Sequence, residues 1–276
     1  MRIDAHHHLW DLDRRPQPWM TGPELDPIAR TFRFADLVPH LDAHGIDATV
    51  LVQSSSSLDE TRELLDIAGK SGGRIAGVVG WADLTDPALP EVLASLDGPL
   101  AGIRHQVQDE ADPRWLARPD VRAGLSAVAE AGLVYDLLVT PLHLPVAVET
   151  ARALPGLRFV LDHGGKPPVA AGGWEPWAAH ITELAALPHV SCKLSGLVTE
   201  ADWQEWRPRD VLPYARHLLD AFGPDRLLFG SDWPVCTLAA QYTDVFALAE
   251  QAASGLGSEE RDAVFGGNAA AVYGLG

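Results

Sequence analysis

The segment RIDAHHHL (residues 2–9) begins with alternating apolar residues and ends with three consecutive histidines. Side chains two residues apart in a β-strand face the same side, so we expect His6 and His8 to point into one space and His7 to point away from it. Such a pair either binds a metal ion, polarises a substrate atom, or packs as hydrogen-bonded core residues. Because the histidines continue an apolar strand pattern, they belong to the fold and not to a purification tag.

Short apolar runs alternate with longer amphipathic stretches along the chain, a pattern typical of repeated βα units. The eight predicted strands are RIDAHHHL (2–9), ATVLVQS (48–54), IAGVVGWA (75–82), PLAGIRHQ (99–106), LVYDLLV (133–139), LRFVLDH (157–163), HVSCKLS (189–195) and RLLFGSDW (226–233). The stretches between them end in glycine signals such as His44-Gly45 and Ala131-Gly132, as helices do before a turn. A chain of 276 residues matches the usual barrel length of about 250 residues. The pattern therefore predicts an α/β fold in which residues 1–276 form a single (β/α)8 TIM-type barrel.

The charge balance limits the kinds of partner. The chain has 21 Lys+Arg against 38 Asp+Glu, which gives a formal net charge of -17. Negative charge of this size repels phosphate backbones and anionic lipid headgroups, so neither nucleic acid nor a membrane surface is an expected partner. Apolar residues make up 47% of the chain, which is enough for a sizeable core. A small molecule is the expected partner, and formation of a homo-oligomer stays open.

The beginning of the chain and its cysteines predict the compartment. MRIDAHHHLW (1–10) lacks the apolar stretch of a signal peptide, and no run of about 18 apolar residues occurs. Cys192 and Cys236 are too few for a disulfide framework and lack zinc-finger spacing, although one pair can still form. These features predict a soluble, cytoplasmic protein.

Two further polar residues are expected beside the histidine pair. Strand six ends in LDHGGKP (161–167), and strand alternation predicts that His163 points inward, as do Leu161 and Phe159. Strand eight ends in GSDWP (230–234) and neighbours strand one in a closed barrel, so Asp232 should lie beside His6 and His8. An aspartate at this point can also simply cap a loop. Convergence with three histidines favours a site over a cap.

Cationic residues are expected at the same mouth of the barrel. Strand four contributes Arg104 and His105, followed by Gln106, and strand seven contributes Lys193. These groups either bind a substrate carboxylate or oxyanion, or form an internal salt bridge with a residue such as Asp136. A desolvated Lys193 could also form a Schiff base, but that chemistry leaves the histidine cluster unused.

The longest irregular stretches, roughly 10–32, 164–178 and 196–210, follow predicted strands, where barrel enzymes build their sites. Six of the nine tryptophans lie in them: Trp10, Trp19, Trp174, Trp177, Trp203 and Trp206. They either form an apolar wall over a ligand or anchor the loops against the barrel rim.

Five motifs together resemble a known family. They are HHHLW (6–10), GIRH (102–105), DHGGKP (162–167), CKLSGL (192–197) and GPDRLLFGSDWPV (223–235). In this order and at these strand ends, they resemble the sugar-lactonase branch of the amidohydrolase superfamily, which includes L-fuconolactonases and L-rhamnonolactonases. The resemblance covers essentially the whole chain.

The resemblance implies a barrel that hydrolyses a lactone, with Asp232 as general base. It also implies that His6, His8 and His163 bind either a divalent metal ion or the lactone carbonyl directly. The sequence departs from the binuclear pattern of the superfamily, because strand four ends in Arg104-His105 and strand five offers Asp136. His143, just beyond strand five, is expected to be a loop residue and not a ligand. One metal ion or none is therefore expected, and the candidate is a zinc on His6 and His8 completed by His163 or Asp232.

The expected reaction is the opening of a sugar-acid lactone, such as L-fucono- or L-rhamnono-lactone, to the free acid. Asp232 would take a proton from the attacking water and return it to the ring oxygen. The carbonyl would be polarised by the metal ion or by donors among Arg104, His105 and Lys193. The alternatives are a metal-dependent decarboxylase of the same superfamily and a non-catalytic barrel that binds sugar acids.

Overall fold

The computed structural model describes residues 1–276 and contains eight parallel strands in the order β1-β2-β3-β4-β5-β6-β7-β8. The strands are β1 (Ile3–His7), β2 (Ala48–Val52), β3 (Ile75–Gly80), β4 (Leu100–Gln106), β5 (Val134–Leu138), β6 (Arg158–Leu161), β7 (Val190–Leu194) and β8 (Leu227–Phe229). The ring is completed just beyond β8, where His8 N donates to Trp233 O at 2.7 Å and Asp232 N donates to His6 O at 2.8 Å. The predicted (β/α)8 barrel is thus confirmed.

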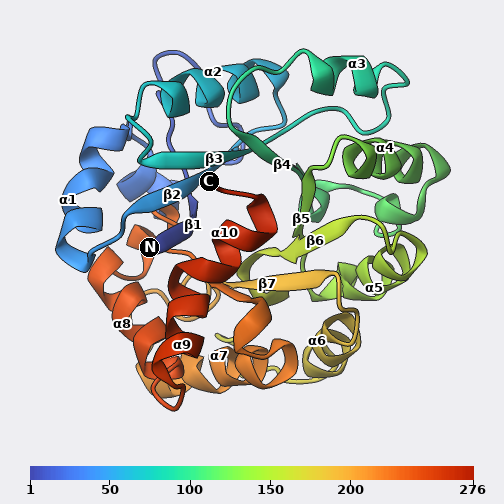
Figure 1. The fold of residues 1–276 in the computed structure, drawn as a ribbon. Helices are drawn as coiled ribbons and strands as arrows, with labels where there is room; N and C mark the ends of the chain where they lie inside the picture. The colour runs from blue at the N-terminus through green and yellow to red at the C-terminus, as the bar shows by residue number, and fades with distance from the viewer.

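A ring of helices surrounds the strands (Figure 1). The helices are α1 (Phe34–His44), α2 (Leu58–Gly69), α3 (Leu89–Ala94), α4 (Pro119–Glu130), α5 (Leu144–Ala153), α6 (Trp177–Ala185), α7 (Pro208–Phe222), α8 (Tyr242–Ala252), α9 (Ser258–Asp262) and α10 (Asn268–Tyr273). Gly45 ends α1 in the left-handed conformation (φ 62), and the Ser57 hydroxyl accepts a hydrogen bond from Glu60 N at the start of α2. The longest helix, α7, has 15 residues, and none has the length and hydrophobicity that a membrane-spanning segment needs.

Apolar side chains form two clusters, one on each side of the strands. The larger cluster of 67 buried residues fills the space between strands and helices. The smaller cluster of 12 fills the lower interior of the barrel and includes Ile3, Val50 and Val160 together with Ala269 and Tyr273 of α10. α10 crosses the barrel opening in Figure 1, so this end is closed by the last helix of the chain.

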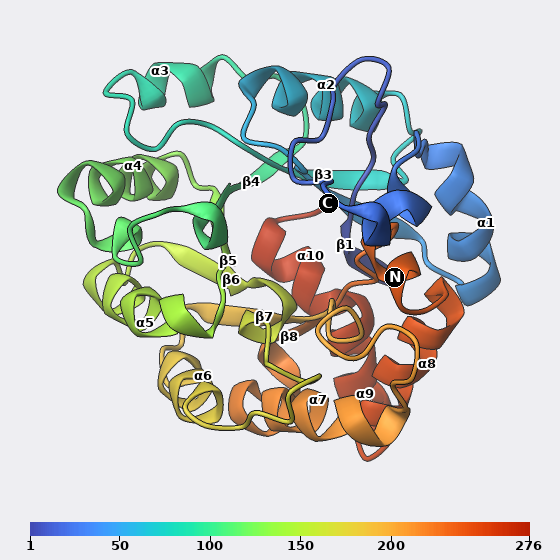
Figure 2. The ribbon, with the colours of Figure 1, turned by 180° about the vertical axis from the view of Figure 1, so that it is seen from behind.

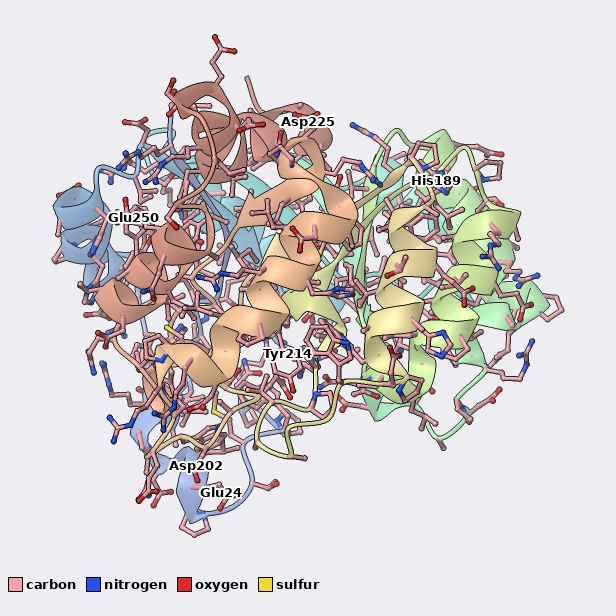
Figure 3. All side chains as sticks on the ribbon, turned by 90° about the horizontal axis from the view of Figure 1, so that it is seen from below. Glu24, His189, Asp202, Tyr214, Asp225 and Glu250 are labelled. Atoms are coloured by element: carbon pink, nitrogen blue, oxygen red, sulfur yellow. The ribbon has the colours of Figure 1, made fainter.

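The opposite end carries the longer loops that follow the strands (Figure 2). Figure 3 separates the two ends: Glu24 and Asp202, which follow β1 and β7, lie at one end, whereas His189 and Asp225, which precede β7 and β8, lie toward the other. Since the carboxyl ends of parallel strands all meet at the end with the longer loops, polar residues that follow the strands gather there. We call this end the mouth.

Candidate active site

His6 and His8 meet at the mouth because of the way β1 ends. Between Asp4 and His7 the pairing of β1 with β2 shifts register, and His6 Nε2 comes within 3.2 Å of His8 Nε2. His7 points the other way: its Nε2 contacts the Thr49 hydroxyl at 2.9 Å, and its ring lies 6.3 Å from that of Phe34 in α1. The predicted orientation of all three histidines agrees with the structure.

His163 also points into the mouth, but its orientation does not come from the predicted strand alternation. In β6 it is Val160 that packs in the interior cluster, whereas Phe159 and Leu161 pack in the outer cluster. The predicted alternation for this strand is therefore wrong, and the inward residue beyond Val160 is Asp162. His163 turns into the mouth because its backbone adopts the left-handed conformation (φ 53), which brings its ring centroid to 4.5 Å from that of His6.

Asp232 also stands in the left-handed region (φ 57), just after β8. Its Oδ1 lies 3.5 Å from His8 Nε2, 3.7 Å from His6 Nε2 and 4.0 Å from His163 Nε2. One carboxylate oxygen thus faces three imidazole nitrogens, and this group is almost fully buried. The four residues that the sequence predicts at one site are brought together.

His8 and His163 each make a hydrogen bond through Nδ1, the ring nitrogen that faces away from the mouth. Their Nε2 atoms are therefore free for a ligand. His8 Nδ1 lies 2.8 Å from Val52 O, which can only accept, so Nδ1 carries the proton and Nε2 keeps its lone pair. His163 Nδ1 contacts the Ser195 hydroxyl at 2.9 Å, so its Nε2 also faces the mouth. Ligands at zinc distances in a tetrahedral site lie about 3.3 Å apart, which matches the separations around His6, His8 and Asp232. The donor set fits one divalent ion.

The ionisation of these groups suits proton transfer or metal binding. Burial lowers the pKa of His6 well below its usual value, and burial lowers the pKa of His163 to about 4, so both rings are neutral at pH 7. Burial alone would raise the pKa of Asp232, but the neighbouring His163 and His8 outweigh it and lower that pKa. Asp232 is consequently an ionised carboxylate that can accept a proton.

A network of buried charges lies directly beneath the histidines. Lys193 Nζ contacts Asp136 Oδ2 at 2.5 Å and Asp162 Oδ1 at 2.9 Å, and Arg104 Nη1 contacts Asp162 Oδ2 at 2.8 Å. From below, the Tyr273 hydroxyl of α10 reaches both oxygens of Asp136 at 2.9 Å. Two cations are therefore balanced by two carboxylates.

The network of buried charges shows which of the expected roles Lys193 has. Its side chain is fully buried and lies below the mouth, and the salt bridge with Asp136 that the sequence left open is present. An ammonium group held between two carboxylates has no lone pair for a Schiff base, so that alternative finds no support. Arg104 combines both roles, because it pairs with Asp162 and also lines the cavity described next.

A cavity of about 140 Å³ lies above this network. Its polar lining includes His8, Arg104, Gln106, His163, Lys166 and Asp232. A second cavity of about 410 Å³ shares Trp19, Gln106 and Asp109 with it and leads outward. A separate cavity of about 260 Å³, between the loop after β1 and α2, contains none of the converging groups. The converging polar groups therefore line the cavity at the mouth and not this separate one.

The structure places His105 outside this cavity. Its Nε2 contacts Glu110 Oε1 at 2.7 Å, its Nδ1 accepts from Trp81 Nε1 at 3.0 Å, and its ring stacks on Trp115 at 4.1 Å. The expectation that it lines the mouth with Arg104 is wrong, because consecutive residues of β4 face opposite sides. His143 contacts the Thr140 hydroxyl from a short 3-10 helix in the connection after β5 and, as expected, lies outside the cavity.

The loop tryptophans mostly anchor the rim. Trp10, Trp177, Trp203 and Trp206 donate their indole N–H groups to backbone carbonyl oxygens, and Trp174 packs beside Trp177. Only Trp19 of the six lines the cavity. The structure therefore supports loop anchoring for five of the six tryptophans, and only Trp19 is placed to cover a ligand. Cys192 and Cys236 are both free and buried.

Two residues of the site were missed in the sequence, although both lie within DHGGKP (162–167). Asp162 is the shared partner of Arg104 and Lys193, and it is signalled by alternation counted from Val160. Lys166 lines the cavity beside His163, and only its place in the loop after a strand indicates it.

Known proteins are similar to this chain in sequence and fold over nearly their full length. The family profile described as Amidohydrolase matches residues 3–275. The L-fucono-1,5-lactonase of Burkholderia ambifaria is 44% identical over 278 residues, covering 99% of this chain and 95% of the relative. That of Burkholderia multivorans is 44% identical over 287 residues, covering 100% and 96%. A crystal structure of an amidohydrolase from B. multivorans with bound zinc is 42% identical, covers 100% of both chains and superposes with a TM-score of 0.95.

Proposed function

Because the chain belongs to the amidohydrolase family, we propose that it is a single-domain hydrolase that opens a sugar-acid lactone, such as L-fucono- or L-rhamnono-lactone, to the free acid. The observation that carries the proposal is the convergence of one ionised carboxylate, Asp232, with His6, His8 and His163. Asp232, His8 and His163 line a polar cavity, and His6 is buried behind them. A lactone is an ester whose leaving group stays attached, so no covalent enzyme intermediate is needed.

Asp232 is the proton acceptor of the proposed reaction. It takes a proton from water as the water oxygen bonds to the lactone carbonyl carbon, which gives a tetrahedral intermediate with a negatively charged oxygen. The ring C–O bond then breaks, and Asp232 returns the proton to the departing ring oxygen. The product carboxylic acid ionises in solution. One carboxylate serves both steps because the two oxygens concerned are attached to the same carbon.

His6 and His8 would hold one zinc ion, with His163 or Asp232 completing the set. Nitrogen and carboxylate oxygen donors at these separations suit zinc, and an amidohydrolase similar over its whole length binds it. When bound, the ion supplies positive charge to the carbonyl oxygen. If the enzyme works without a metal ion, Arg104 polarises the carbonyl directly as a hydrogen-bond donor. His163 can donate as well, because its Nδ1 can accept from the Ser195 hydroxyl and so leave the ring proton on Nε2.

Arg104 holds an oxygen of the substrate in this proposal. Its guanidinium is fixed by Asp162 Oδ2 and by the Gln53 carbonyl oxygen, so it enters the cavity already oriented. The decarboxylase alternative is not favoured, because the two relatives that are 44% identical over nearly the whole chain are named L-fucono-1,5-lactonases.

A screen of aldonolactones with a pH indicator tests this function. Protein stripped of metal and then resupplied with zinc should release acid from at least one lactone faster than the spontaneous reaction, and Asp232→Asn should abolish this release. A protein that is stabilised by sugar acids but opens no lactone would instead be a binding barrel.

A further inference from the structure

Three non-glycine residues of the chain have a positive φ angle, and all three line the cavity at the mouth. They are His163 (φ 53), Lys166 (φ 52) and Asp232 (φ 57). The left-handed region is uncommon for residues with a Cβ, and such conformations cluster at functional sites. His163 and Asp232 already have roles in the proposed reaction. Lys166 shares their backbone geometry and their cavity, yet no role has been assigned to it.

Of the three cations at the site, Lys166 has the weakest ion pair with a carboxylate of the protein. Lys193 lies between two carboxylates, and Arg104 is paired with Asp162 at 2.8 Å. The nearest carboxylate to Lys166 Nζ is Glu200 Oε1 at 3.9 Å, close to the limit of an ion pair and beyond hydrogen-bond distance. The three N–H donors of its ammonium group are therefore available to a ligand in the cavity.

The position of Lys166 relative to Asp232 suits a substrate oxygen. Both side chains line the same cavity of about 140 Å³, so a substrate oxygen bound there lies near both of them. A carbonyl carbon attacked by water beside Asp232 would place its oxygen within the field of this ammonium group. The side chain of Lys166 is 23% exposed, so it can reach a ligand while much of its stem is packed.

We propose that Lys166 contacts the substrate, donating hydrogen bonds to the carbonyl oxygen that becomes negative when water adds to the lactone and then to the product carboxylate. This inference rests on the proposed lactonase function and adds a catalytic residue to it. Lys166 stays protonated throughout. The proton still moves from water to Asp232 and on to the ring oxygen, so the balance of the reaction is unchanged.

Kinetics of four proteins test the role: wild type, Lys166→Met, Lys166→Arg and the control Lys70→Met. Lys70 is exposed and pairs with Asp66 on α2, far from the mouth. Lys166→Met should lower kcat by about 10²–10³-fold, as the loss of one oxyanion contact does, and Lys166→Arg should recover part of it. Lys70→Met should match wild type. Since methionine also has a Cβ, the backbone strain at position 166 is the same in the variant.

A second measurement observes Lys166 without relying on turnover. The chain has only three lysines, Lys70, Lys166 and Lys193. Reductive methylation with ¹³C-formaldehyde should label Lys70 and Lys166, while Lys193 is fully buried. The N-terminal amine gives a further signal, and the Lys70→Met and Lys166→Met proteins assign the lysine signals in an NMR spectrum. Titration with sodium L-fuconate should shift the Lys166 signal and leave the Lys70 signal unchanged.

The outcomes separate this inference from the function on which it rests. If wild type opens no lactone, the proposed function fails. If wild type is active while Lys166→Met keeps wild-type kcat and KM, or if L-fuconate leaves the Lys166 signal unmoved, the role of Lys166 is overturned and the lactonase remains. A shifted Lys166 signal together with a kcat that falls in Lys166→Met and partly returns in Lys166→Arg supports the inference.

Discussion

Lys193 Nζ lies 3.1 Å from His6 Nδ1 in the fully buried floor of the site. Arg104 Nη1 approaches the other ring nitrogen, Nε2, at 3.3 Å, and both cations can only donate. A neutral imidazole accepts at one nitrogen only, so it cannot accept from both. Asp162 Oδ1 lies 3.3 Å from His6 Nδ1, so it can accept a hydrogen bond from an Nδ1–H group, and this favours the tautomer with the proton on Nδ1. His6 Nε2 then presents its lone pair to the mouth.

Removal of Lys193 should destabilise the fold strongly. Lys193→Met leaves Asp136 and Asp162 buried without their shared cation, and breaking a buried ion pair costs about 3–5 kcal/mol. Urea unfolding should show this loss in the free energy of unfolding. The double variant Lys193→Met/Asp136→Asn removes one of the stranded charges and should recover part of it. Equal stability of wild type and Lys193→Met would mean that the network is not a structural support.

Asp232→Asn should lower kcat by several orders of magnitude and leave substrate affinity nearly unchanged. Asparagine keeps the shape of the side chain but cannot accept the proton from water. The measurement is steady-state kinetics on the best lactone from the screen, with circular dichroism as a check on folding. Near-normal turnover by the folded Asp232→Asn protein would show that another group is the base.

Arg104→Met should mainly raise KM. The guanidinium is fixed by Asp162 and the Gln53 carbonyl oxygen before the substrate arrives, so it can bind an oxygen equally in the ground and transition states. A loss confined to kcat would instead place Arg104 on the oxyanion, the role that we give to Lys166. Asp162 keeps Lys193 as a partner, so the variant should lose less stability than Lys193→Met.

His7→Gln serves as a control for the orientation of the first strand. His7 contacts the Thr49 hydroxyl on the side of β1 that faces the helices. Loss of this hydrogen bond should cost about 0.5–1.5 kcal/mol of stability, measured by thermal unfolding, and kcat should stay within about twofold of wild type. An inactive but folded His7→Gln protein would contradict the assigned orientation.

The barrel could be predicted from sequence because it depends on periodicity. Each apolar run alternates with an amphipathic stretch, and every strand end contributes to the same mouth, so His6, His8 and Asp232 were expected together. Alternation also separates neighbours on one strand, and applying it to β4 would have set His105 apart from Arg104.

The orientation of His163 could not be predicted from strand periodicity. Its entry into the mouth depends on a left-handed backbone turn, and nothing in the period of a strand indicates where the strand ends and such a turn begins. Asp162 was not predicted for the same reason, because the end of β6 could not be located from the sequence. It continues the inward face of β6 beyond Val160. Lys166 was missed because loop residues have no periodicity that assigns them to a face.

Metal content should equal one zinc ion per chain when the protein is prepared without chelators. The ligands are expected to be His6 and His8, with His163 or Asp232, and elemental analysis on wild type and His8→Gln should show the loss of the ion in the variant. Chelation of wild type should lower its unfolding temperature, because an ion that binds the folded state stabilises it by mass action, and added zinc should restore the temperature together with kcat. His44→Gln, altered on α1 away from the mouth, is the matched histidine control and should keep its zinc. Wild type that is fully active with no stoichiometric metal, and whose kcat is unaffected by chelators, would assign carbonyl polarisation to His163, Arg104 and Lys166 alone.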